Sequence, residues 1–243
     1  MVEGNDTIEA YNAVAPFYSR YSEEKLPYLD AVDRIVIERL QSRKSLLDIG
    51  SGDGRRLSKF QSQTKISDIT AIEPSAKMAE ICRINTGVIV YESYAEQIDS
   101  LNLDKYDAIT ALWNVLGHIP NQEARIRSLK NIYQLMKPES ILIIDVNNRH
   151  NSSAYGRWQV FKRTIIDRLN FKDSRGDAEY EWNIDNKSFK SRGHLFIPKE
   201  IEALFKIAKL TVCDRFSIDY TNGNVSTSIY KGQLLYILKP MGS

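Results

Sequence analysis

The sequence has few of the residues that build cross-links or metal centres. Its 243 residues include two cysteines, Cys82 and Cys213, and three histidines. These are too few for a disulfide framework, and they show no metal-ligand spacing, so no metal is expected. No apolar run approaches the roughly 18 residues that span a bilayer. The N-terminus lacks the basic start and apolar stretch of a signal peptide. We therefore expect a cytoplasmic protein with no membrane partner.

Neither sign of charge predominates in the sequence. The chain carries 33 basic and 31 acidic residues, a net charge of +2. This near-balance of charge indicates neither a nucleic acid nor an anionic surface as a partner. A hydrophobic share of 42% with 26% charged residues is ordinary for a globular chain that buries a full core.

Short apolar runs alternate with amphipathic segments over the first 146 residues. Strands separated by single helices, nearly all apolar, predict an α/β fold with a Rossmann-like, mostly parallel sheet and helices on both faces. Two later runs, separated by the turn-rich TNGNVS, predict a C-terminal antiparallel hairpin and bring the sheet to seven strands. The expected strands are 45–50, 68–73, 87–92, 106–114, 140–146, 210–220 and 228–238; the expected helices are 28–43, 55–63, 74–85, 121–137 and 198–209.

The alternation stops after the fifth strand. Residues 147–194 contain seven aromatic residues, with ten basic against six acidic residues. We predict an inserted cap here. The core would then comprise 1–146 and 195–240; the family resemblance given below implies in addition that about 1–27 form an N-terminal lid and that the cap binds the acceptor.

The segment LLDIGSGDG, residues 46–54, places three glycines on alternate positions after an expected strand. A dinucleotide fingerprint needs a third small residue at position 55, where Arg55 stands, and no Lys-Ser/Thr pair of a P-loop follows. Asp48 precedes the glycines. Glu73 ends the next strand, where a carboxylate suits both hydroxyls of a ribose. The pattern predicts a ribose-bearing cofactor without a phosphate.

Together these motifs resemble the class I S-adenosylmethionine-dependent methyltransferases of the small-molecule type (methyltransferase type 11/25-like), over about residues 8–146 and 194–238. The resemblance implies S-adenosylmethionine as cofactor and S-adenosylhomocysteine as product. The glycines would admit the cofactor, Asp48 would orient its amino-acid end and Glu73 would bind its ribose. The implied cofactor-binding residues are Tyr11, Tyr18, Asp48, Gly50, Ser51, Gly52, Gly54, Glu73, Pro74, Ser75, Met78, Tyr94, Ala95, Glu96, Leu112, Trp113 and Asn114.

The resemblance also implies methyl transfer to a nitrogen or oxygen of a small-molecule metabolite, by in-line displacement and mainly through positioning. Asn114 would position the reactants, and His118 is the candidate base. For His118 and His194 a packing role is the alternative. The candidate acceptor-binding residues are Trp113, His118, Arg149, Tyr155, Arg157, Trp158 and His194.

Two other functions remain open at this level. An RNA (tRNA) methyltransferase shares the same core, but the low net charge and the lack of a polybasic segment argue against it. A regulatory protein that binds the cofactor without transferring methyl groups is the second alternative. The sequence leaves open whether the chain forms a homodimer.

Overall fold

The computed structural model describes residues 6–184 and 187–242, so residues 1–5 of the predicted lid and 185–186 of the predicted cap lie outside the described residues. The strands are β1 Ser45–Ile49, β2 Asp68–Ile72, β3 Ile89–Tyr91, β4 Tyr106–Ala111, β5 Met136–Val146, β6 Asp177–Ile184, β7 Lys187–His194, β8 Leu210–Ile218, β9 Val225–Ser226 and β10 Gln233–Pro240. The helices are α1 Asp6–Val14, α2 Tyr18–Glu23, α3 Leu26–Leu40, α4 Arg55–Gln63, α5 Ala76–Thr86, α6 Val115–His118, α7 Gln122–Gln134, α8 Ser152–Tyr155, α9 Arg157–Leu169 and α10 Pro198–Ile207, with 3₁₀ segments that include η1 Ala15–Phe17, η2 Ala95–Leu101 and η3 Asp173–Gly176.

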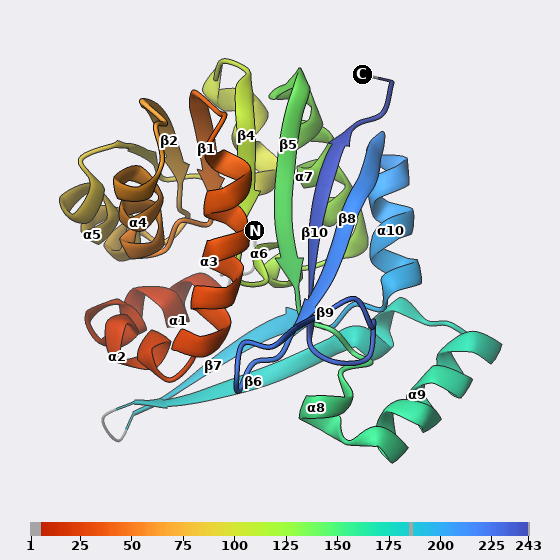
Figure 1. Ribbon diagram of the computed structural model, residues 1–243. Helices are drawn as coiled ribbons and strands as arrows, with labels where there is room; N and C mark the ends of the chain where they lie inside the picture. Colours follow the sequence, from red (N-terminus) through yellow and green to blue (C-terminus); the bar gives the residue numbers. More distant parts are fainter. Residues whose placement is uncertain (1–5, 185–186, 243) are drawn as a thin grey trace.

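The centre of the fold is an eight-stranded sheet in the order β3-β2-β1-β4-β5-β10-β8-β9 (Figure 1). The five strands from β3 to β5 run parallel, and β10 pairs antiparallel with both β5 and β8. The predicted Rossmann-like fold with an antiparallel C-terminal pair is therefore confirmed. The strand beyond the predicted seven is β9, which has two residues and pairs with the end of β8.

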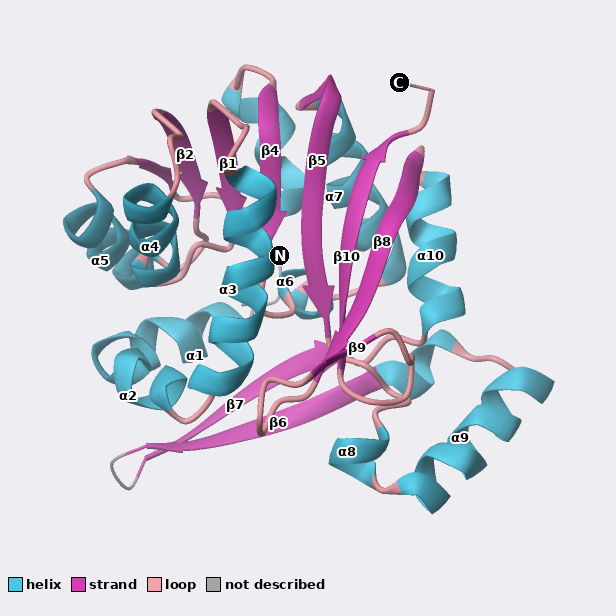
Figure 2. Cartoon of the chain, viewed as in Figure 1, coloured by secondary structure: helices cyan, strands magenta, loops and turns pink. Residues whose placement is uncertain are grey.

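Successive side chains of the central strands enter different cores, as the alternation of a strand requires. In β1, Leu46 packs into the core under α3, α4 and α5, whereas Leu47 packs into the core under η2, α7 and α10. Figure 2 shows helices on both sides of the strands. Burial on both faces explains why these strands are apolar throughout.

Two helix starts match side-chain capping chemistry. Asn121 accepts a hydrogen bond from the backbone N–H of Ala124 and begins α7, as predicted. Ser75 accepts from the N–H of Met78 and begins α5. The helix predicted over 121–137 ends at Gln134, and β5 begins at Met136 rather than at residue 140.

The insert forms a support for the lid at the carboxyl ends of the parallel strands. Its strands β6 and β7 make a separate antiparallel hairpin that runs beneath the sheet, beside α1 and α2 (Figure 1). The Thr7 hydroxyl on α1 donates to the Arg192 carbonyl on β7 over 3.5 Å. The chain thus folds a late segment against its first helix.

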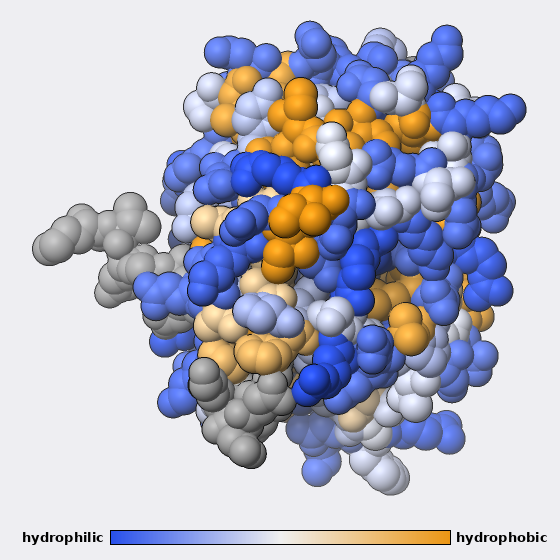
Figure 3. Space-filling view, turned by 90° about the vertical axis from the view of Figure 1, so that its left-hand side faces the viewer, coloured by the Kyte–Doolittle hydropathy of each residue, from blue (hydrophilic) through white to orange (hydrophobic). Residues whose placement is uncertain are grey.

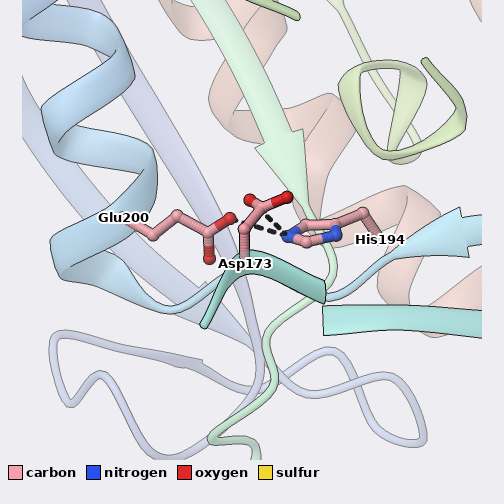
Figure 4. Close-up of side chains that lie close together, drawn as sticks. All are labelled: Asp173, His194 and Glu200. Atoms are coloured by element: carbon pink, nitrogen blue, oxygen red, sulfur yellow. Dashed lines mark hydrogen bonds and ion pairs between the residues drawn. The ribbon is translucent and has the colours of Figure 1, made fainter. Parts of the chain in front are cut away.

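A buried ion-pair cluster fastens the root of this hairpin to the core (Figure 4). His194, fully buried at the end of β7, lies 2.8 Å from a carboxylate oxygen of Asp177 through Nδ1 and 2.7 Å from one of Glu200 through Nε2. The buried guanidinium of Arg125 on α7 lies 3.8 Å from Asp173. The cluster therefore joins η3, β6 and β7 to α7 and α10.

We expect His194→Ala to lower the free energy of unfolding by about 3 kcal/mol, because it opens a cavity and removes the imidazole partner of the buried Glu200 carboxylate. Urea unfolding followed by circular dichroism measures this. Glu179→Gln on β6 is the control, since the pair of Glu179 with Arg192 is 80% and 72% exposed; its effect should stay within about 0.5 kcal/mol. Equal midpoints for the wild type and His194→Ala would contradict the anchoring role.

Candidate active site

The glycine turn after β1 has a backbone that side chains disfavour. Gly50, Gly52 and Gly54 have φ values of +72°, +57° and +76°. A Cβ on Gly50 would lie 2.4 Å from Val115, and one on Gly54 would lie 2.8 Å from the sulfur of Cys82. One on Gly52 would meet only a tyrosine ring of the lid at 3.6 Å. Packing therefore leaves no room for a side chain at Gly50 and Gly54, whereas Gly52 faces the cavity beneath Tyr18 of the lid.

Glu73 holds this turn from the end of β2. Its Oε2 accepts the N–H of Gly52 at 2.8 Å and its Oε1 accepts the N–H of Ser75 at 2.9 Å. Burial raises the pKa of Glu73 to about 7, against the effect of these two hydrogen bonds. A carboxylate can accept about four hydrogen bonds. Glu73 therefore retains capacity for two ligand hydroxyls.

Two adjoining cavities meet at the turn. The first encloses about 750 Å³ including its mouth, a size typical of small-molecule sites. Tyr18, Gly50, Gly52, Leu112 and Trp113 line both cavities, so Tyr18 and Trp113 stand at their junction. The predicted cofactor residues that line the first cavity are Tyr11, Tyr18, Gly50, Gly52, Glu73, Pro74, Tyr94, Ala95, Glu96, Leu112 and Trp113, and His118 joins them.

The second cavity has a charged wall. It contains Asp48 and Ser51, as well as Arg56 of α4. Burial raises the pKa of Asp48, whose Oδ1 accepts from the Thr110 hydroxyl at 2.6 Å. Arg56 pairs with buried Asp33 at 2.7 Å. This wall offers both signs of charge, as the amino and carboxylate groups of an amino acid require.

Four predicted cofactor residues lie behind the cavity walls rather than in them. Gly54 packs against α5, Ser75 caps that helix, and Met78 is fully buried. Asn114 is buried, and its Oδ1 accepts the N–H of Asn147 at 2.9 Å. The structure gives these residues supporting positions.

A buried carboxylate shapes the turn after β4 that carries Trp113. Trp113 and Asn114 have φ values of +66° and +63°, a left-handed conformation that asparagine tolerates and that is unfavourable for the bulky Trp113. Asp145 at the end of β5 accepts both of their N–H groups through Oδ1, and Tyr28 donates to its Oδ2. Burial raises the pKa of Asp145, and the nearby charge of Arg56 opposes this shift. Asp145 therefore positions Trp113.

Aromatic rings from distant segments surround Trp113. The ring of Tyr18 lies 5.6 Å from Trp113, and that of Tyr21 stacks on it at 5.9 Å with an interplanar angle of 11°. The indole N–H donates to the Tyr220 hydroxyl, and Tyr220 stacks on Tyr28 at 4.4 Å. The negative faces of such rings favour a cation.

His118 bridges the lid and the hairpin. Its Nδ1 lies 3.1 Å from the Arg192 carbonyl, which only accepts, so Nδ1 carries the proton. Its Nε2 lies 3.2 Å from the hydroxyl of Tyr11, which then donates to it. Burial lowers the pKa of His118 and raises that of Tyr11, so both are neutral near pH 7. Both ring nitrogens are engaged in holding the cavity closed.

The structure does not bring the insert's five candidate acceptor residues to Trp113 and His118. Arg149 pairs with buried Asp167 at 2.9 Å, and His194 lies in the ion-pair cluster. None of the five lines either cavity. The other three are Tyr155, which lies under the guanidinium of Arg163, and the exposed Arg157 and Trp158 of α9.

Several side chains of the site were not predicted. Asp145 has one sequence signal, an acid within the apolar run SILIIDV. Tyr21, Arg56 and Tyr220 have none, because their partners lie elsewhere in the chain.

The ion-pair cluster also brings together donor atoms that a metal could use. Asp173, His194 and Glu200 each place one such atom within 4.8 Å of the others. The His194 ring already lies between two carboxylates, and the guanidinium of Arg125 approaches Asp173. Two basic side chains therefore face the carboxylates where a metal would sit. That the protein needs no metal stays a prediction.

We expect Asp145→Asn to lower the free energy of unfolding by about 2 kcal/mol, because a neutral amide oxygen accepts the N–H groups of Trp113 and Asn114 more weakly than a carboxylate does, and the amide nitrogen cannot accept the Tyr28 hydroxyl. Weaker binding of S-adenosylhomocysteine should accompany the loss, since Trp113 loses its support. Denaturant unfolding and calorimetry measure the two effects. Asp214→Asn, which breaks a half-exposed pair with Arg39, is the control and should change stability by less than about 0.5 kcal/mol. Matching results for the two variants would refute the role of Asp145.

Affinity for S-adenosylhomocysteine should rise about tenfold from pH 6 to pH 8. The ribose hydroxyls donate to an ionised carboxylate, and with a pKa of about 7 the ionised fraction of Glu73 grows about tenfold over this range. Calorimetric titration at each pH measures it. Glu73→Gln should bind at least about tenfold more weakly at pH 8 and lose the pH dependence. A pH dependence that persists in this variant would assign it to another group.

Comparisons with known proteins agree with this geometry. A family model described as a methyltransferase domain matches residues 18–212. No curated protein sequence matches the chain. Similar solved structures include an S-adenosylmethionine-dependent methyltransferase from Clostridium acetobutylicum (15% identity, 93% and 98% of the two chains, TM-score 0.64), a possible histamine N-methyltransferase from Thermotoga maritima (18%, 95% and 98%, 0.63) and the sugar N-methyltransferase KedS8 from a Streptoalloteichus species (15%, 93% and 91%, 0.61). The chain belongs to the methyltransferase-domain family and is a class I S-adenosylmethionine-dependent methyltransferase.

Proposed function

We propose that this enzyme transfers a methyl group to a nitrogen of a small-molecule amine. The observation that carries the proposal is the wall around Trp113, which consists of aromatic rings beside a neutral histidine with both nitrogens engaged. The proposal concerns the acceptor and adds to the established methyltransferase family.

The two cavities fit the two ends of S-adenosylmethionine. Glu73 has free acceptor capacity for the ribose hydroxyls, and Tyr94 and Ala95 line the first cavity, where the adenine would lie. Asp48 in the second cavity would receive the amino group. The cofactor supplies a methyl group activated by its sulfonium. Trp113, at the junction of the cavities, would then lie beside that positive charge.

The same surroundings favour nitrogen over oxygen as the methyl acceptor. A neutral amine attacks without a base, whereas a hydroxyl usually needs one. The candidate base His118 donates through Nδ1 and accepts through Nε2, and Tyr11, its partner, has a raised pKa. The chain's contribution is then to align the reactants and to exclude water. KedS8, a sugar N-methyltransferase, shares the fold and supports this choice.

Two basic residues at the start of the insert give no support to an RNA acceptor. Arg149 is paired with Asp167, and Arg163 lies over the ring of Tyr155. These side chains are used within the protein. We propose a cytoplasmic enzyme that acts on a metabolite.

The test is to incubate the enzyme with methyl-labelled S-adenosylmethionine and a cell extract, with Glu73→Gln as the control. Label should appear at low mass, on compounds that a cation exchanger retains, and it should resist mild base that cleaves methyl esters. RNase-sensitive label at high mass would contradict the proposal in favour of RNA. If cofactor binds but labelling equals the control, the regulatory alternative gains support.

A further inference from the structure

Helix α9 turns its apolar face away from the protein. Trp158, Phe161, Ile165 and Leu169 are 78%, 56%, 43% and 82% exposed, and their spacing of three and four residues places them on one side of the helix. Val160 and Asp167 on the opposite side are buried. In Figure 1 the helix projects at the lower right, away from the sheet.

The exposed charges of α9 are all positive. Arg157, Lys162 and Arg168 are exposed and flank the apolar face on both sides. The one acid of the helix, Asp167, is buried against Arg149, and Arg163 is turned towards the ring of Tyr155. An apolar strip bordered by cations is complementary to a partner that has an apolar interior beneath an anionic surface.

A second copy of the chain fits this face less well. A helix of 13 residues is about 20 Å long and about 10 Å wide, so its outer strip covers roughly 200–400 Å², against about 800 Å² per partner in a stable interface. A symmetric pairing would also place the cationic flanks against each other. RNA fits this face less well too. Trp158 and Phe161 offer rings on which a base can stack, but a nucleic acid would leave Ile165 and Leu169 in water.

We propose that α9 binds the surface of an anionic lipid membrane. Trp158, Phe161, Ile165 and Leu169 enter the boundary between headgroups and acyl chains, and the flanking cations pair with lipid phosphates, as in other interfacial helices. No helix in the described part of the chain is long and apolar enough to cross a membrane. Binding at the surface requires none. The sequence-based expectation of no membrane partner rested on the lack of a spanning segment and on the low net charge, and neither reveals cations gathered on one helix.

This surface is separate from the active site. No residue of α9 lines either cavity. Variants of its outer face should therefore keep cofactor affinity, and S-adenosylhomocysteine binding reports whether each variant is folded.

The test is sedimentation of the purified protein with vesicles of phosphatidylcholine alone or mixed with phosphatidylglycerol. We expect binding to the anionic vesicles at 50 mM salt, at least about tenfold weaker binding to neutral vesicles, and a similar loss at 0.5 M salt. The double variant Trp158→Ser/Leu169→Ser and the triple variant Arg157→Gln/Lys162→Gln/Arg168→Gln should each lose at least about tenfold in vesicle affinity.

Ile84→Ser is the matched control. Ile84 lies on α5 and is 77% exposed. Figure 3 shows the side of the molecule that carries α5, where hydrophobic residues form separate groups among hydrophilic ones. This variant should bind vesicles like the wild type.

Three results would overturn the proposal. They are the absence of wild-type binding to anionic vesicles at 50 mM salt, an equal loss in Ile84→Ser, and a dimer in light scattering that Trp158→Ser/Leu169→Ser dissolves. The last would assign the face to a second copy of the chain.

Discussion

The active site depends on one buried carboxylate. Asp145 receives the N–H groups of Trp113 and Asn114 and thereby holds both in the left-handed conformation, which is unfavourable for Trp113. It also receives the hydroxyl of Tyr28 from α3. Through these bonds the end of β5 determines where the Trp113 ring lies between the two cavities. An acid is suited to this place because it accepts several hydrogen bonds and donates none.

Enclosure of the cavity depends on contacts between the N-terminal lid and the β6–β7 hairpin of the insert. The lid residues Thr7 and Tyr11 reach the hairpin directly or through His118, which also contacts the Arg192 carbonyl. The insert therefore contributes to the site mainly by holding the lid. Its own predicted acceptor residues are used in ion pairs, in ring contacts or on the outer face of α9.

The cofactor half of the site was largely predictable. A glycine turn after one strand and an acid at the end of the next are encoded by local spacing, and parallel strands bring both to the same edge of the sheet. The ring cluster around Trp113, where we propose that the acceptor binds, was not predictable. Trp113 is surrounded by Tyr21, Tyr220 and Tyr28, which come from segments far apart in the chain. No periodicity in the sequence predicts contacts between such distant segments. For α9 the pattern even misleads, since an apolar stripe usually marks the side that faces a core.

The sequence by itself determined the fold class, the presence of the parallel strands and the glycine turn that is predicted to meet the cofactor. These follow from hydrogen bonding and side-chain alternation over a few residues, which leave a periodic record. Only the tertiary structure decided which rings surround Trp113, that His118 joins lid and hairpin, and that the apolar face of α9 points outward. Those outcomes depend on how separate elements pack, because the free energy of packing belongs to pairs of surfaces and leaves no trace in the spacing of either one.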